Sequence, residues 1–322
     1  MKLALAGDTM LGRNVGRQLA AFPDEPLFTD EVVAAAREAD LFVLNLECAI
    51  SARGTPWPDP FKRFFFRAPP VAAEVLRDLG VGCVTLANNH ALDFGPDALA
   101  DTFRHLSAAG IARVGAGHDR KEAREPAVLH RGGTAVGIVA VADHPADFAA
   151  GPDRPGTAYA DLAAGVPRWL LDGIAGLGTD ITVVTPHWGP NMVARPVPHV
   201  RAAAGAFRGA GATLVAGHSA HVFHGVQDHV LYDLGDFVDD YATDRRLRND
   251  LGLLFLVTFG DGAVDGRHRP VRLEAVPLAL DPCRTRMAEP EEHRWTARRF
   301  RRACAAFGTE VTEEGGRLVV TW

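Results

Sequence analysis

The sequence has few lysines and no excess of positive charge. Only three of its 34 basic residues are lysines, and the formal net charge is −6. Such a chain lacks the basic field that binds nucleic acid. No apolar run approaches the ~18 residues of a membrane span, and the opening MKLALAGDTMLG lacks the pattern of a secretory signal. We therefore expect a cytoplasmic protein with neither nucleic-acid nor membrane partners.

Cysteine is also scarce. The four cysteines form no CxxC pair and have no framework spacing, so we expect reduced, mostly buried thiols. Hydrophobic residues make up 47% of the chain and charged residues 23%, values that exclude a disordered or coiled-coil protein. The 322 residues are enough for about two domains of ~150 residues or for one large domain.

Short apolar runs of strand length alternate with helical stretches until about residue 216, and strands dominate afterwards. The expected strands are 2–7, 41–46, 82–86, 134–141, 181–185, 213–216, 230–234, 251–259, 271–277 and 317–322. The expected helices are 30–39, 71–79, 95–110, 167–175, 197–208 and 291–307. This order favours an α/β fold in which two sheets pack together with helices outside.

Residues 1–260 are expected to form one domain, and 261–322 an extension of strands and a helix packed on it. The polar connection 260–269 is the candidate boundary between them. Two other connections, 51–70 and 142–157, are long and rich in proline. Loops of this length in a compact domain are usually functional, so we expect them to form walls of a site.

The 13 histidines are unevenly spread, and four of them fall between positions 218 and 229. Position at strand ends is more informative than this clustering. Polar side chains follow most of the expected strands: Asp8, Glu47, Asn89, His90, His187, His218 and His221. Ligands of open α/β sheets bind at the carboxyl ends of the strands. These seven side chains are therefore expected at one edge of the fold.

Each of these residues has an ordinary explanation when taken alone. Asp8 could cap a helix, and Asn89 with His90 could form an Asx turn. Together they supply carboxylate, amide and imidazole ligands, a set that suits one or two divalent ions of Mn, Fe or Zn. Glu47 could span two ions. His90, beside Asn89, is placed to act as a general acid on a leaving oxygen.

The motifs that contain these residues carry a family resemblance. GDTMLGR, NLECAI, LANNHALDFG, GAGHDRKEA, PHWG, GHSAHVFHG and LYDLGDFVDDY resemble, in order and spacing, the CapA family of poly-γ-glutamate capsule synthesis. That family is related in fold to the metallophosphoesterases, and the resemblance covers residues 1–259. It implies a four-layer α/β/β/α sandwich and a catalytic role for His90. It also implies metal ligands at Asp8, Glu47, Asn89, His187, His218 and His221.

The sequence departs from the wider pattern at several positions. Metallophosphoesterases begin with Asp-x-His, but Met10 stands two residues after Asp8, so one metal site lacks an imidazole and the site could hold one ion or two. Glu47 replaces a bridging Asp, and Ser219 stands where many relatives have a further His. Many relatives also have SLGNF where this chain has DLGDF, with Asp236 in place of Asn.

Arginines near the motifs suggest an anionic substrate, because the guanidinium group recognises phosphate and carboxylate in a planar, bidentate manner. The candidates are Arg13 and Arg17, which follow Asp8, and Arg67 in the aromatic-rich loop that also holds Lys62 and Arg63. A solvated arginine surface explains them equally well. Further candidates for contact with the substrate are Asp143, His144 and His224. Asp236, Asp239 and Asp240 could belong to a structural ion-pair network.

Three functions remain open at this point. The first is a metal-dependent hydrolase in which activated water attacks a phosphoester of a small anionic substrate, with His90 as general acid. The second is a metal enzyme that acts on an amide, such as a γ-glutamyl or peptide bond. The third is a non-catalytic protein of poly-γ-glutamate synthesis or assembly. The sequence names neither the substrate nor the oligomeric state.

Overall fold

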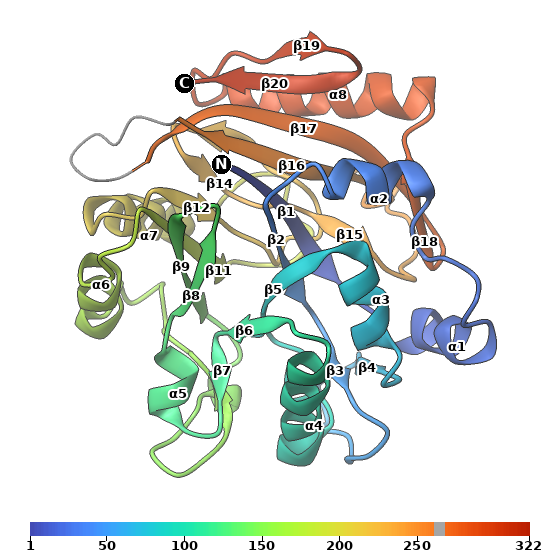
Figure 1. Cartoon of the computed structure of the whole chain (residues 1–322), viewed down its shortest axis with the longest axis vertical. Helices are drawn as coiled ribbons and strands as arrows, with labels where there is room; N and C mark the ends of the chain where they lie inside the picture. The colour runs from blue at the N-terminus through green and yellow to red at the C-terminus, as the bar shows by residue number, and fades with distance from the viewer. Residues whose placement is uncertain (261–267) are drawn as a thin grey trace.

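The computed structural model describes residues 1–260 and 268–322, and its largest element is a ten-stranded sheet (Figure 1). The strand order is β19-β20-β17-β16-β1-β2-β5-β6, with β15 beside β1 and β18 beside β17. These strands span β1 (Lys2–Thr9), β2 (Leu41–Leu46), β5 (Val81–Thr85), β6 (Ala112–Val114), β15 (Asp236–Val238), β16 (Leu251–Phe259), β17 (Pro270–Asp281), β18 (Arg284–Met287), β19 (Thr312–Glu314) and β20 (Arg317–Thr321). β1, β2, β5 and β6 run parallel.

A second sheet has six strands in the order β13-β14-β12-β11-β9-β8. The strands are β8 (Ala127–Arg131), β9 (Thr134–Ala142), β11 (Ile181–His187), β12 (Leu214–Ala216), β13 (Val226–Gln227) and β14 (Val230–Leu231). β9, β11, β12 and β14 run parallel. Two small pairs complete the sheets: β3 (Ala49–Ile50) with β4 (Arg67–Ala68), and β7 (Ala116–Gly117) with β10 (Gly156–Thr157).

The two large sheets pack face to face, with helices on both outer sides. Leu5 and Phe255 of the first sheet share one buried cluster with Ile138 and Val183 of the second. The opposite face of the first sheet packs against α1 (Arg13–Ala21), α2 (Asp30–Ala36), α3 (Ala72–Leu79) and α4 (Gly95–Ala108). The outer face of the second sheet packs against α6 (Arg168–Ala175) and α7 (Pro198–Gly209). This arrangement confirms the expected four-layer α/β/β/α sandwich.

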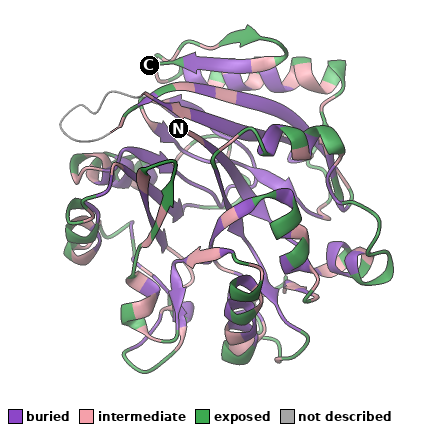
Figure 2. Cartoon of the chain, viewed as in Figure 1, coloured by how far each residue is buried: buried purple, intermediate pink, exposed green. Residues whose placement is uncertain are grey.

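The strands are buried because both faces of each large sheet are covered, which explains their continuous apolar sequences. Figure 2 shows the buried residues concentrated on the strands and the exposed residues on the outer helix surfaces. Gly80, with φ of +94°, ends α3 as the sequence indicates. All four cysteines are free and buried.

The chain after β16 continues the first sheet. β17 pairs with β16, and β20 pairs with β17, while α8 (Pro290–Ala305) packs its Phe300 against Phe255. Most of the connection 260–269 lies outside the described residues. α5 (Arg120–Arg124) and the short 3₁₀ helix Ala146–Phe148 lie in the connections. Among the described residues, none of the helices has the length and apolarity that crossing a membrane requires.

Candidate metal centre

The carboxyl ends of the parallel strands of both sheets meet at one place. Asp8 lies near the end of β1, and His187 is the last residue of β11. Glu47 follows β2, and His218 follows β12 closely enough to form a bridge with His187. The sandwich therefore brings together side chains from segments more than 200 residues apart in the sequence.

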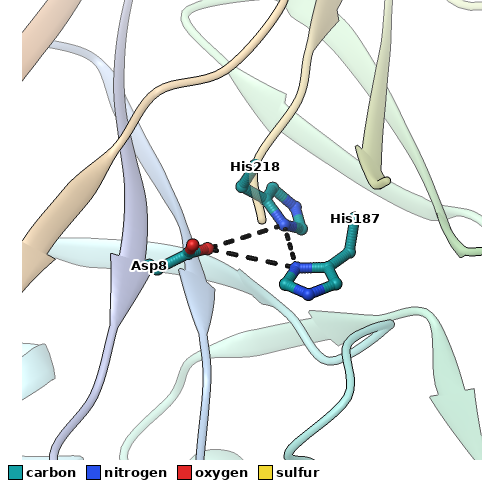
Figure 3. Close-up of side chains that lie close together, drawn as sticks. All are labelled: Asp8, His187 and His218. Carbon is teal, nitrogen blue, oxygen red and sulfur yellow. Dashed lines mark hydrogen bonds and ion pairs between the residues drawn. The ribbon is translucent and has the colours of Figure 1, made fainter. Parts of the chain in front are cut away.

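Asp8, His187 and His218 form the first group of close ligand atoms (Figure 3). The Nδ1 atoms of the two imidazoles lie 2.8 Å apart. Asp8 Oδ1 lies 3.8 Å from Nδ1 of His218 and 4.0 Å from Nδ1 of His187. All three side chains are almost completely buried. Three donors that face a common point fit a divalent transition metal.

Asp8 also belongs to a second group, with His221 and Asp236. His221 Nδ1 lies 3.2 Å from Asp8 Oδ2 and 2.8 Å from Asp236 Oδ1. Ser219 and His221, in the loop that follows β12, have positive φ angles of 116° and 58°. Backbone in this region is uncommon for non-glycine residues and is concentrated at functional sites.

Neighbouring polar groups orient these ligand atoms. Asn45 Nδ2 donates to Asp8 Oδ1 at 2.8 Å and to Glu47 Oε2 at 3.0 Å. The hydroxyl of Thr185 lies 3.0 Å from Nε2 of His218. If Nε2–H donates to this hydroxyl, the lone pair of Nδ1 faces Asp8 and His187. Such outer contacts fix the tautomer of a metal-binding imidazole.

Burial and charge shift the pKa values of the centre in opposite directions. Burial acts to raise the pKa of Asp8, but the imidazoles of His221, His187 and His218 outweigh it and the pKa is lowered. Burial, then the charge of Asp8, raises the pKa of Glu47 well above its usual value. Burial also raises the pKa of Asp236. Carboxylates that are expensive to ionise in this way create a demand for a cation.

Several buried side-chain atoms of the residues at this centre have no hydrogen-bond partner among the described residues: Glu47 Oε1, Asn89 Oδ1, His187 Nε2 and Asp236 Oδ2. Buried polar atoms without partners are costly, and each one requires an explanation. Carboxylate, amide and imidazole atoms are the chemical types that bind Mn, Fe or Zn. The residues present therefore fit a metal centre, with the identity of the ion left open.

His90 lies beside this centre in its own hydrogen-bonded arrangement. Its Nδ1 lies 2.6 Å from Asp93 Oδ2, and its Nε2 lies 3.7 Å from Glu47 Oε1. Lys62 Nζ lies 2.9 Å from Asp93 Oδ1, and the Phe66 ring packs edge-on against the imidazole. Burial lowers the pKa of His90, and the charge of Asp93 acts against this shift.

A cavity of about 520 Å³ opens at His90 and His221. Cationic, aromatic and amide side chains line it, including Arg13, Arg63, Phe64, Asn191, Tyr241 and Asn249. The Arg13 guanidinium lies 5.3 Å from the Phe64 ring centroid and 5.9 Å from that of Tyr241, and it pairs with Asp240. The long loop 51–70 supplies Phe64, so it forms a wall of this cavity.

The other substrate candidates lie at different distances from this cavity. Arg17 and Arg67 line an adjoining cavity that also contacts Arg13. Asp143 hydrogen-bonds to His144, whose ring centroid lies 5.1 Å from that of His187. His224 is buried, and its Nε2 lies 2.8 Å from the carbonyl oxygen of Val193. It contacts backbone and is not among the described residues that line the cavity at His90.

Three residues of the site have roles that the sequence analysis missed or undervalued. Asn45 precedes Glu47 by two residues, so strand periodicity places both side chains on one face. Asp93 follows His90 by three residues. Asp236 contacts His221 instead of joining an ion-pair network with nearby arginines, since Arg248 pairs with Asp250. Met10, at the position of the missing imidazole, is buried in the apolar core.

Comparison with known proteins agrees with the motifs. A family model described as "Bacterial capsule synthesis protein PGA_cap" matches residues 2–241. A "Probable polyglutamine synthesis accessory protein" of Mycobacterium tuberculosis is 33% identical over 299 residues, covering 87% of this chain and 76% of that protein. The "PGA biosynthesis protein CapA" of Bacillus subtilis is 26% identical over 286 residues, covering 87% and 72%.

Solved structures match more weakly. A hypothetical protein from Thermus thermophilus has a TM-score of 0.49 at 17% identity, covering 86% of this chain and 98% of its own. A 5'-nucleotidase precursor from the same organism has a TM-score of 0.41 at 16% identity, covering 91% and 55%. The family assignment rests on the sequence matches alone. Because the family model spans most of the chain and the motifs occur in its order, this protein belongs to the PGA_cap, or CapA, family of bacterial capsule synthesis proteins.

Proposed function

We propose that this protein is a metal-dependent hydrolase that cleaves a phosphoester of a small anionic substrate, with His90 as the general acid. The observation that carries the proposal is the buried donor group of Asp8, His187 and His218, together with His90, whose Nε2 lies 3.7 Å from Glu47 Oε1. A divalent ion held there would supply an activated water and polarise a phosphoryl oxygen. Glu47, Asn89 and His221 are the further proposed ligands.

His90 is oriented for proton transfer. Asp93 accepts from Nδ1–H, and this contact directs Nε2 toward the centre, where the leaving oxygen of a substrate would need a proton. Asp93 also accepts from the backbone N–H of Phe66, and Lys62 pairs with its other oxygen. These contacts hold the carboxylate in place. Asp93 is therefore proposed as a positioning residue for the imidazole.

The cavity beside His90 suits an anionic substrate. Aromatic rings and carboxylates hold Arg13 and Lys62 in place, so these side chains lose little conformational entropy when a ligand binds. Arg63 also lines the cavity. We propose that Arg13 contacts an oxyanion of the substrate. Arg17 and Arg67 would contact only a substrate long enough to reach the adjoining cavity, and Asp143 and His144 only one that passes His187.

The test of this proposal compares two leaving groups. The metal-loaded His90→Asn variant should lose about 10²- to 10⁴-fold in kcat on an alkyl phosphodiester, because an alkoxide leaves only with a proton. The loss on a p-nitrophenyl ester should be much smaller, since that group leaves as an anion. His105→Asn on α4 serves as the control. Equal losses on both substrates would rule out general-acid catalysis by His90.

The names of the relatives keep amide hydrolysis as the second candidate. Proteins similar to this one are named for PGA biosynthesis and polyglutamine synthesis. Besides the proposed ligand Asn89, Asn191 and Asn249 line the cavity and could bind an amide. In that case a γ-glutamyl amide, and no phosphodiester, would turn over. A non-catalytic assembly role would instead leave every phenotype unchanged in the His90→Ala and His187→Ala variants.

A further inference from the structure

The two donor groups that share Asp8 differ in chemistry. His187 and His218 make the first group rich in imidazole, whereas His221 and Asp236 make the second a mixture of imidazole and carboxylate. Imidazole-rich sites suit zinc or iron, and carboxylate oxygens suit harder ions such as manganese. Two ions bound at the two groups would therefore experience different ligand fields.

Asp236 is positioned by a strand and not by a flexible loop. β15 pairs in parallel with β1, and Asp236 is the register partner of Asp8. Parallel neighbours in register point their side chains to the same face of a sheet. The backbone thus holds the two carboxylates side by side, with His221 Nδ1 within 3.2 Å of an oxygen of each.

The ion pair with His221 accounts for only one of the two carboxylate oxygens of Asp236. Its Oδ1 contacts the imidazole, but its Oδ2 is buried and has no hydrogen-bond partner among the described residues. Asp233 provides a contrast three residues earlier. Both of its oxygens accept backbone N–H groups, from Ala220 and Gly235. Asp233 is therefore satisfied by the fold itself, whereas Asp236 retains one oxygen without a hydrogen-bond partner among the described residues.

The packing of the carboxyl groups leads to the same conclusion. Asp8, Asp236 and Glu47 are buried together, and the imidazole of His221 lies between the first two. Buried carboxyl oxygens without partners are costly, so a group of this kind suits a bound cation. A hard divalent ion meets this need better than a proton does, because it also satisfies the free oxygens of Asp236 and Glu47.

We propose that Asp236 is a metal ligand, and that the centre is asymmetric. The group of Asp8, His221 and Asp236 has the weaker preference for zinc over manganese. The group of Asp8, His187 and His218 has the stronger preference for zinc. This inference rests on the metal centre of the proposed function, but not on the reaction catalysed there.

The test uses the full chain, stripped by a chelator and then loaded with Zn²⁺. Titration with Mn²⁺ should displace one zinc per chain well before the other, as measured by elemental analysis and by the paramagnetic resonance of bound manganese. Asp236→Asn should weaken manganese binding at least about tenfold, the usual minimum for loss of a ligand or its support, and should leave one zinc in place. Asp101→Asn removes a buried carboxylate that pairs with Arg53 and Arg104 and belongs to neither group, and it should leave both ions.

Each other result has a defined meaning. Wild-type protein that binds no metal overturns the proposed function as well as this inference. Manganese affinity that is unchanged in Asp236→Asn, or an equal loss of both ions, overturns the inference alone. If Asp236→Asn does not fold, anomalous scattering from wild-type crystals at the manganese and zinc edges decides the matter. Manganese that enters the group of His187 and His218 before it enters the group of Asp236 would contradict the proposal.

Discussion

The carboxylates of the metal centre and those of the C-terminal part of the sheet are neutralised in different ways. In the C-terminal part, Arg286 lies between Asp281 and Glu292, at 2.8 and 2.7 Å. All three side chains are partly exposed. At the centre, Glu47 Oε1 and Asp236 Oδ2 are buried and have no partner among the described residues. The C-terminal carboxylates are therefore paired with a cationic side chain, whereas these two oxygens of the centre are not.

The pKa shifts express the same difference. Arg286 lowers the pKa of Glu292, since a nearby cation favours the charged form. Burial raises the pKa of Glu47 and of Asp236, and the nearby imidazole of His221 does not offset it. Acidic residues are common on protein surfaces, so their number says little about function. What distinguishes the centre is that it contains buried carboxylate oxygens without a partner among the described residues.

The largest expected effect comes from Asp8→Ala, because Asp8 belongs to both donor groups. We expect the purified variant to contain no stoichiometric metal and to lose at least about 1000-fold in activity. A bound ion contributes several kcal/mol to the transition state, and about 4 kcal/mol corresponds to that factor. Elemental analysis and steady-state kinetics measure the two quantities.

Asp281→Ala is the matched control from the other region. It removes a half-exposed carboxylate whose partner is the partly exposed Arg286, so metal content and activity should match those of the wild type. If Asp8→Ala retained its metal, or if Asp281→Ala lost it, the distinction between the two regions would not hold.

A second comparison concerns two imidazoles of one loop. His221 faces carboxylates: burial acts to lower its pKa, but Asp236 and Asp8 outweigh burial and the pKa is raised well above the usual value. His224 faces a backbone carbonyl, and burial lowers its pKa to about 4. Unfolded histidine titrates near 6.5. Between these values the unfolded chain binds more protons, so the folded state loses stability as the pH falls from 6.5 to 4.

We therefore expect His224→Gln to flatten the pH dependence of unfolding in this window. The full contribution of one such group is about 1.4 kcal/mol per pH unit. Denaturant unfolding of the metal-free protein at several pH values measures it. His130→Gln, on the exposed surface of β8, should leave the slope unchanged. A slope that is the same in His224→Gln and in wild type would show that His224 is not held neutral.

The smallest expected effect comes from Arg317→Met. Arg317 hydrogen-bonds to Glu38, and its Nη1 lies 3.4 Å from Glu274. These side chains are partly exposed, so solvent screens the pairs and their loss should cost less than about 1 kcal/mol. Thermal unfolding measures the cost. A much larger loss of stability would mean that these partly exposed ion pairs contribute as much to stability as buried ones do.

The elements and most of the candidate residues could be predicted from the sequence. Alternation of apolar strands with helices indicated the sandwich, and polar residues at strand ends indicated the edge where Asp8, His90 and His187 meet. Strand and helix patterns are local, so a single chain displays them directly. The C-terminal strands were also visible, but the pairing of β17 with β16 was not.

The contacts that orient the ligands could not be predicted in the same way. Asn45 connects Asp8 to Glu47, and Asp93 orients His90. Asparagine and aspartate near turns usually cap helices or form Asx turns, so their local sequence does not distinguish a support from a cap. The role of Asp236 depends on the pairing of β15 with β1, two segments that are far apart in the chain.

By itself, the sequence determined the family motifs, the four-layer architecture and the types of ligand atom available. These follow from residue chemistry and from periodicity along the chain. Only the tertiary structure decided that Asp8 is shared by two donor groups, that Met10 packs into the core and that Asp236 faces His221. The physical reason is strand register, because a shift of one residue would turn each of these side chains to the opposite face of the sheet.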